Sequence, residues 1–372
     1  MLNPQAFLDL IKSHGIHFST GVPDSLLKDF AGCIADSGSD IIAANEGGAI
    51  ALAAGHYLAT GEIPFVYMQN SGFGNTVNPL ASLVDPEVYS IPMLLMIGWR
   101  GEPGVKDEPQ HVKQGRISET LLDAMEIRYD ILSSEIEEAK EQVETAVHYM
   151  EKHQAPYVLL VRKGTFDSYK MKNLPQVPDY EMNREDAVKV ILGQLNTEDV
   201  VVSTTGKTSR EVFEKRASDH SGHERDFLTV GCMGHASQIA LGIALAKKGR
   251  KVFCLDGDGA FLMHMGSSAI IASQAPENYF HIVINNGSHD SVGGQPTVGF
   301  DMDFGKVAEG CGYKSVFKAE TKTELENLWE QFVVTEGPVF LEVKVRKGAR
   351  KDLGRPTIKP VENKRDFMNN LK

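Results

Sequence analysis

The sequence has little cysteine, no long apolar run and no excess of positive charge, and each shortage excludes a class of protein. The four cysteines are scattered and form no Cys-x-x-Cys pair, which favours free thiols over a disulfide framework or a zinc ribbon. The apolar run Ile91–Trp99 contains Pro92 and Gly98 and is too short to span a bilayer. A net charge of −12 argues against nucleic acid and anionic membranes as partners. Because no basic region followed by an apolar stretch opens the sequence, we expect a soluble cytoplasmic protein.

The length of 372 residues is enough for two domains of ordinary size. Strand and helix patterns alternate through both halves, which predicts an α/β fold with two doubly wound parallel sheets. We expect domains at 1–170 and 184–372, joined by a proline-rich linker at 171–183. The basic stretch 346–372 reads as a solvated arm or a subunit contact.

The stretch from Lys251 to Asn286 predicts one parallel βαβ unit. An apolar strand, Lys251–Leu255, leads into Gly-Asp-Gly at 257–259, and Phe261–Ala272 has the composition and length of a helix. A second strand, His281–Ile284, ends at Asn285-Asn286. The Asp and the Asn should therefore lie at the carboxyl ends of neighbouring strands, where open α/β sheets bind ligands.

These residues have the chemistry of a site for a divalent ion bound to phosphate. Asp258 offers an anionic oxygen and Asn286 a neutral amide oxygen, the hard ligands that Mg²⁺ prefers. Gly257 and Gly259 would let the backbone approach a phosphate closely. Gly-Asp-Gly alone is more typical of a tight turn after a strand, and only the asparagine pair one strand later favours the metal.

This arrangement resembles the thiamine diphosphate fingerprint of the pyruvate decarboxylase and acetolactate synthase superfamily. The resemblance implies Asp258, Asn286 and the backbone carbonyl of Ser288 as Mg²⁺ ligands. It also implies one module for the pyrimidine ring and one for the diphosphate. Most decarboxylases of that superfamily have a third, central domain, for which this chain has no room.

The pyrimidine ring of the cofactor needs a carboxylic acid beside it, because a hydrogen bond to a ring nitrogen promotes loss of the thiazolium C2 proton. Glu46 follows a predicted strand and opens an apolar helix, although a glutamate there could simply stabilise the helix terminus. In similar enzymes this Glu comes from a neighbouring subunit, which implies a homo-oligomer with active sites at the interface. The resemblance further implies that Met233 wedges the cofactor and that the Gly231 carbonyl accepts from its aminopyrimidine. Met233 could instead be ordinary core packing.

The substrate should be a 2-keto acid whose carboxylate is held near the cofactor. Asp24 and Ser25 lie in a turn between a predicted strand and helix, and in similar decarboxylases a Ser of this turn contacts the carboxylate. Asn70 ends the strand expected beside it. His111 and His289 are candidate proton donors, and each could equally be a structural hydrogen-bonding residue.

An anionic substrate on an acidic chain requires a local cluster of positive groups. Three loops that follow predicted strands could supply it, with Arg100, with Arg162-Lys163, and with Lys207 and Arg210. A surface charge is the ordinary explanation for each of them. We take Arg100, Lys163 and Lys207 as the candidate substrate residues.

Five longer stretches resemble the 2-keto acid decarboxylases that act on 3-phosphonopyruvate; they are residues 20–28, 69–75, 99–104, 204–210 and 285–297. The resemblance implies conversion of 3-phosphonopyruvate to phosphonoacetaldehyde and CO₂ in phosphonate biosynthesis. Sulfopyruvate is the alternative substrate. A non-catalytic, thiamine diphosphate-binding regulatory subunit is a second alternative, which the presence of Glu46, Asp258 and Asn286 disfavours. An NAD site is weaker still, because Gly72-Phe-Gly74 lacks the third glycine of the dinucleotide motif.

Overall fold

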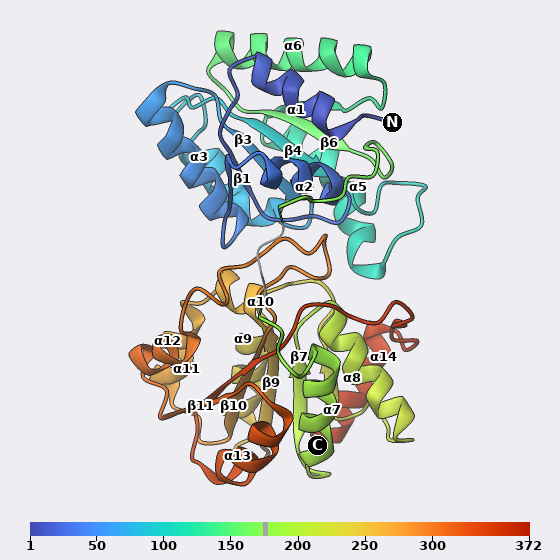
Figure 1. The fold of residues 1–372 in the computed structure, drawn as a ribbon, viewed down its shortest axis with the longest axis vertical. Coiled ribbons are helices and arrows are strands. Elements are labelled where there is room, and N and C mark those ends of the chain that lie inside the picture. The colour runs from blue at the N-terminus through green and yellow to red at the C-terminus, as the bar shows by residue number, and fades with distance from the viewer. Residues whose placement is uncertain (174–177) are drawn as a thin grey trace. The chain divides into compact units, whose positions relative to one another are not determined.

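The computed structural model describes residues 1–173 and 178–372, which form two compact units. The N-terminal unit is Met1–Pro175 with Val292–Gln295, and the C-terminal unit is Gln176–Ser291 with Pro296–Lys372. Each unit is a parallel sheet with helices on both faces (Figure 1), which confirms the predicted fold class. Residues 174–177 of the predicted linker lie outside the described residues, so its bounds stay a prediction.

The sheet of the N-terminal unit has six parallel strands in the order β2-β1-β3-β4-β6-β5. The strands are β1 (Ser19–Gly21), β2 (Asp40–Ile42), β3 (Phe65–Gln69), β4 (Leu94–Gly98), β5 (Arg128–Ile131) and β6 (Tyr157–Val161). The helices are α1 (Pro4–Ser13), α2 (Lys28–Asp36), α3 (Glu46–Thr60), α4 (Val77–Ser82), α5 (Pro109–Ala124) and α6 (Ile136–His153).

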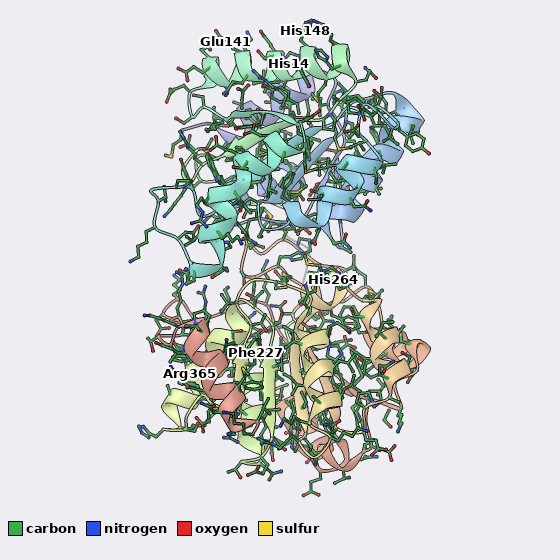
Figure 2. All side chains as sticks on the ribbon, turned by 180° about the vertical axis from the view of Figure 1, so that it is seen from behind. His14, Glu141, His148, Phe227, His264 and Arg365 are labelled. Carbon is green, nitrogen blue, oxygen red and sulfur yellow. The ribbon has the colours of Figure 1, made fainter. Side chains whose placement is uncertain are left out.

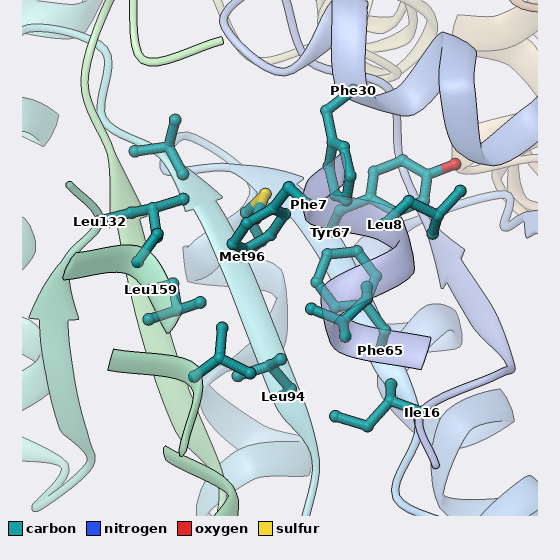
Figure 3. Close-up of a cluster of buried hydrophobic side chains, with 14 of the residues drawn as sticks. Phe7, Leu8, Ile16, Phe30, Phe65, Tyr67, Leu94, Met96, Leu132 and Leu159 are labelled. Atoms are coloured by element: carbon teal, nitrogen blue, oxygen red, sulfur yellow. The ribbon is translucent and has the colours of Figure 1, made fainter. Parts of the chain in front are cut away.

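Both faces of this sheet are buried, because successive side chains of each strand enter different cores. Phe65, Tyr67 and Met96 pack under α1, α2 and α6 (Figure 3), while Val66 and Met68 face α3 on the other side. The helices that cover the sheet are amphipathic. On α6, for example, Glu141 and His148 point to solvent (Figure 2), while other positions of that helix belong to the core.

The sheet of the C-terminal unit has the order β11-β12-β10-β9-β7-β8, again all parallel. Its strands are β7 (Val200–Ser203), β8 (Asp226–Leu228), β9 (Val252–Gly257), β10 (Tyr279–Asn285), β11 (Ser315–Ala319) and β12 (Val339–Lys344). Its helices are α7 (Arg184–Gln194), α8 (Lys207–Ser218), α9 (Ala236–Ala246), α10 (Asp258–Met263), α11 (Ser267–Gln274), α12 (Phe304–Cys311), α13 (Lys322–Val334) and α14 (Pro360–Asn370).

The C-terminal segment is part of this unit, so the prediction of a solvated arm is wrong. The α14 helix packs on β8, and Phe367 is 3% exposed. Asn363 donates to the Asp226 carbonyl at 2.7 Å and accepts from the Leu228 amide at 3.1 Å, which continues the edge of the sheet. Of the basic residues that suggested an arm, Lys364 and Arg365 are exposed on this packed helix, and Arg350, before it, pairs with Glu185.

Two further segments differ from the prediction. The expected polar loop at 100–111 ends in α5, which begins at Pro109 and places His111 in its first turn. The expected helix Phe261–Ala272 is divided into α10 and α11, because the backbone leaves helical geometry at His264. Among the helices of the described residues, none is both long and apolar enough to cross a membrane.

In each sheet the first and third strands of the unit are neighbours, and the strand order reverses between them. In the N-terminal unit the reversal lies between β1 and β3, and in the C-terminal unit between β7 and β9. Crevices at the carboxyl ends of such strand pairs are where open α/β sheets bind ligands. The loops after β1, β3, β7 and β9 carry Ser25, Asn70, Lys207 and Asp258, so these four candidate residues lie at the reversals.

Candidate active site

The loops after β9 and β10 bring Asp258 and Asn286 together, as the sequence predicts. The two strands pair in parallel, with Ile284 opposite Gly257. Asp258 is the first residue of α10, and the backbone N–H of Asn286 donates a hydrogen bond to its carboxylate. Asp258 and Asn286 are 3% and 4% exposed.

Asp258 is a buried carboxylate with no cationic partner in the described part of the chain. Burial raises its pKa to about 6, against the hydrogen bonds that favour the charged form. Thr297 Oγ1 donates to Oδ2, and the other donors are backbone amides. A divalent cation would supply the missing positive charge, so this environment fits a metal ligand.

The remaining predicted ligands are also oxygens. Asn286 is held at both ends, because its Oδ1 accepts from the Ser288 amide at 3.1 Å and its Nδ2 donates to Asp290 Oδ2 at 3.0 Å. The Ser288 carbonyl accepts from the Asp290 amide at 2.9 Å, and a carbonyl oxygen has two lone pairs. One carboxylate with an amide and a backbone oxygen is a donor set that suits Mg²⁺.

Gly259, next to these ligands, lies close to the side chains of His289 and Met233. A Cβ atom at Gly259 would be 3.1 Å from His289 Nδ1 and 3.4 Å from the Met233 methyl carbon. Met233 is half-buried in a loop in which Gly231, Cys232 and Gly234 all have positive φ. A side chain at Gly259 would crowd this imidazole and this thioether, so glycine lets both groups lie close to the turn that carries Asp258. The roles of Gly231, Met233 and Gly257 stay predictions.

Glu46 is buried at the start of α3 in the N-terminal unit, at 5% exposure. Its Oε2 accepts from Asn75 Nδ2 at 2.7 Å. A side chain at Gly72 would overlap Oε1, so glycine is required where the loop after β3 crosses the carboxyl group. The loop therefore fixes the position of Glu46. Asn75 was missed by the sequence reasoning, although it ends the motif 69–75.

A cavity of about 230 Å³ in the same unit brings together three predicted substrate residues, Ser25, Arg100 and Lys163. Arg100 Nη1 donates to Ser25 Oγ at 2.7 Å. The rest of the guanidinium pairs with Asp107, with Nε 2.7 Å from Oδ2. Lys106 and Lys163 line the cavity and are exposed. Its positive charge toward solvent therefore comes mainly from the lysines, because Asp107 neutralises Arg100.

The side chains of Asn70 and Asp24 form hydrogen bonds with main-chain groups of their own unit. Asn70 donates to the Arg100 carbonyl at 2.8 Å and accepts from the Arg100 amide at 3.2 Å, so it positions Arg100. Asp24 is fully buried, and its Oδ2 accepts from the amides of Leu26 and Leu27 at the entry to α2. Contact of either side chain with substrate stays a prediction.

The two candidate acids are both histidines whose burial disfavours the charged form. Burial lowers the pKa of His289 to about 4, and burial together with Arg100 lowers the pKa of His111. Both imidazoles are therefore neutral near pH 7, where they can donate through one ring nitrogen. Their role as proton donors stays a prediction.

Lys207 opens α8 in the C-terminal unit and is half-buried. Burial lowers its pKa, and the neighbouring carboxylates of Asp290 and Glu211 oppose that shift. These acidic neighbours were missed by the sequence reasoning, as were Thr297 and Asp107. Thr297 and Asp290 stand inside the motif 285–297, which was the available signal for them.

A second group of buried polar residues lies behind the β9 loop. Cys254, Asp256 and His281 have ligand atoms within 4.8 Å of one another. Asp256 Oδ1 accepts from the Gly257 amide at 3.0 Å, and Oδ2 is 3.6 Å from His281 Nε2. The His281 ring also contacts the Tyr313 hydroxyl at 3.0 Å. Asp256 thus contacts the backbone at the start of the Gly-Asp-Gly turn, and His281 lies next to Asp256.

Comparison with known proteins finds a family model that matches part of each unit. The model for the thiamine pyrophosphate enzyme N-terminal TPP binding domain matches residues 4–127, and the C-terminal TPP binding domain model matches residues 205–343. A phosphonopyruvate decarboxylase of Streptomyces viridochromogenes is 35% identical, covering 95% of this chain and 91% of the relative. One from Streptomyces hygroscopicus is 33% identical, with coverages of 99% and 93%. A sulfopyruvate decarboxylase of Methanosarcina acetivorans is 25% identical, with coverages of 94% and 92%.

Proposed function

Because the chain belongs to the phosphonopyruvate decarboxylase family of thiamine diphosphate enzymes, we propose that it decarboxylates 3-phosphonopyruvate to phosphonoacetaldehyde and CO₂. The observation that carries the choice of substrate is the identity of 35% and 33% to two such enzymes over nearly the whole chain. The sulfopyruvate decarboxylase is less similar, at 25%. The reaction would serve phosphonate biosynthesis.

Release of CO₂ tests this proposal directly. We expect CO₂ from phosphonopyruvate only when thiamine diphosphate and Mg²⁺ are both present, and slower release from sulfopyruvate at equal concentration. Faster turnover of sulfopyruvate would make it the substrate. Cofactor binding without turnover of either compound would favour a regulatory subunit.

The C-terminal unit would hold the charged end of the cofactor. Asp258, Asn286 and the Ser288 carbonyl would bind Mg²⁺, and Gly257 and Gly259 would admit the diphosphate to the backbone. When bound, thiamine diphosphate supplies a nucleophilic carbon and an electron sink for the decarboxylation. The residues of this unit would bind and orient it, and the half-buried Met233 would exclude water from one side of the cofactor.

The N-terminal unit would supply the acid and the carboxylate site. Glu46, fixed by Asn75, would donate a proton to the pyrimidine ring. Ser25 accepts from Arg100, so its own O–H is free to rotate toward a substrate carboxylate. Asn70 would keep Arg100 at that hydroxyl through its two main-chain hydrogen bonds.

The phosphonate should be held by positive groups that pyruvate does not need. A hydrogen bond to a charged group contributes about 1.5–3 kcal/mol, so losing one should lower kcat/KM for phosphonopyruvate by roughly 10–150-fold. We predict this loss in at least one of Arg100→Ala, Lys163→Ala and Lys207→Ala, with turnover of pyruvate nearly unchanged. The measurement is the ratio of kcat/KM for the two substrates.

Two features of the structure sharpen this test. Lys152 is an exposed lysine of α6 outside the cavity, so Lys152→Ala should leave the ratio at the wild-type value. Arg100→Ala also leaves the Asp107 carboxylate unpaired, and Lys163→Ala is therefore the cleaner variant. If all three variants kept the wild-type ratio, the phosphonate would be bound elsewhere.

A homo-oligomer with active sites at its interface is supported by the outer face of α3. Positions 48, 51, 52, 55 and 58 follow helical spacing, are small or apolar, and are exposed. Leu52 and Leu58 are 37% and 70% exposed. Such a face on the helix that begins with Glu46 suits contact with a second copy of the chain.

A further inference from the structure

The Asp290 carboxylate joins three segments of the C-terminal unit. Its Oδ2 accepts from Asn286 Nδ2 at 3.0 Å, from Arg184 Nη1 at 3.1 Å and from the Gly348 amide at 3.1 Å. These donors come from the loop after β10, the start of α7 and the loop after β12. Asp290 Oδ2 thus connects the predicted metal ligand Asn286 with the start of α7 and the loop after β12.

Arg184 is itself held in place on its other side. Glu211 accepts from Arg184 Nε at 2.8 Å and from Nη2 at 2.9 Å, a two-point contact. The Glu211, Arg184 and Asp290 side chains are 1%, 7% and 7% exposed. Because Glu211 holds the buried Arg184 by two hydrogen bonds, Arg184 in turn holds Asp290 in a fixed position beside Asn286.

The contact determines which end of the Asn286 amide faces away from Asp290. With Nδ2 donating to a carboxylate, Oδ1 lies at the opposite end of the side chain. The reverse orientation would place Oδ1 against the negative Asp290 oxygen and would lose the hydrogen bond. Only Oδ1 can bind a metal, so the orientation decides whether Asn286 is a ligand.

We propose that Asp290 is the positioning residue that orients Asn286 as a ligand of the divalent ion, with Arg184 and Glu211 as its support. The inference rests on the proposed function, which supplies the ion and the thiamine diphosphate. Partners that orient a metal ligand in this way typically contribute 10–100-fold to metal affinity.

Binding of Mn²⁺ tests the inference without any assay of turnover. Wild-type, Asp290→Ala and Asp290→Asn proteins are titrated with Mn²⁺ at saturating thiamine diphosphate, and free Mn²⁺ is followed by electron paramagnetic resonance. We expect Asp290→Ala to weaken Mn²⁺ binding by about 10–100-fold. Asp290→Asn should weaken it less, because an amide oxygen can still accept from Nδ2. In kinetics, the metal concentration for half-maximal activity should rise while kcat at saturating Mn²⁺ returns to near the wild-type value.

Asp226→Asn is the matched control. Asp226 is also a buried carboxylate paired with an arginine of the same unit, with Arg216 Nε 3.0 Å from its Oδ2, but it contacts no predicted ligand. Its loss should lower the melting temperature and leave Mn²⁺ affinity unchanged in the folded protein. If Asp226→Asn weakened Mn²⁺ binding as much as the Asp290 variants do, the weaker binding would be explained by general destabilisation and the inference would be overturned.

The outcomes separate this inference from the proposed function. If the wild-type protein fails to bind Mn²⁺ with thiamine diphosphate, the proposed function is wrong. If it binds and folded Asp290→Ala binds equally well, only the role of Asp290 is wrong. Should Asp290→Ala fail to fold, the shape-conserving Asp290→Asn decides, and wild-type Mn²⁺ affinity in that variant would count against the proposal.

Discussion

Glu46→Gln protein should bind thiamine diphosphate and Mg²⁺ normally while kcat falls by at least about 10²-fold, the usual contribution of one general acid–base group. Glutamine keeps the shape of the side chain and can still contact Asn75, so the local fold should survive. It cannot give a proton to the pyrimidine ring. Exchange of the C2 proton of the bound cofactor, followed by NMR, should slow in parallel with kcat.

A second acidic residue at a helix start provides the control for Glu46. Glu137 lies in the first turn of α6 and is exposed, so Glu137→Gln changes the charge near a helix terminus in the same way. Its kcat and C2–H exchange should equal those of the wild type. C2–H exchange at the wild-type rate in Glu46→Gln would refute the catalytic role and leave Glu46 as a helix-terminal charge.

Asp258→Ala should abolish binding of the cofactor at micromolar thiamine diphosphate while the fold is retained. Residues that merely support a ligand cost 10–100-fold in metal affinity, so loss of the anionic ligand itself should cost at least about 10²-fold. Removing the carboxylate relieves its desolvation but leaves its hydrogen-bond donors without an acceptor, so the apoprotein should stay folded with at most a modest loss of stability. The measurement is the amount of cofactor that co-purifies, with calorimetric titration of Mg²⁺ and thiamine diphosphate.

Asp303→Ala is the comparison for this variant. Asp303 precedes α12 in the same unit and caps it by accepting from the Lys306 amide at 3.0 Å. Its loss should cost about 1 kcal/mol of stability and leave cofactor binding intact. Asp258→Ala protein that still carries stoichiometric cofactor would contradict the metal assignment.

The two inactive variants together test the interface. If each site takes Glu46 from one subunit and Asp258 from another, mixing Glu46→Gln and Asp258→Ala proteins creates some sites with both residues intact. Part of the activity should then return after subunit exchange. Mixtures that stay inactive although exchange is demonstrated would place both residues of each site in one subunit.

The sequence predicted those parts of the site that depend on local pattern. Asp258 and Asn286 follow apolar runs that could only be buried strands, and parallel pairing then brings the two loops together. Glu46 was found because an apolar helix begins directly after it. In each case the position along one element determined the position at the edge of the sheet.

The contacts that fix these side chains could not be predicted in this way. The bond between Asn75 and Glu46 spans 29 positions, and the bond between Arg184 and Asp290, which in turn contacts Asn286, spans 106. Such pairings depend on how loops cross, which the local sequence pattern does not determine. The α5 helix was missed because its surface is polar and its apolar spacing is weak, so tertiary contacts such as that of Trp99 Nε1 with the Gly115 carbonyl support it.

The pairing of Arg100 with Asp107 has a consequence for how the protein responds to salt. Since that arginine is already neutralised, attraction of a dianion would depend on Lys106 and Lys163, whose charges face solvent. Screening over about 8 Å at physiological ionic strength weakens such exposed charges far more than a partly enclosed pair. Capture of phosphonopyruvate should therefore decline steeply as salt is added, and inorganic phosphate in the cell would compete for the same lysines. Affinity measured in dilute buffer would then overstate the affinity under cellular conditions.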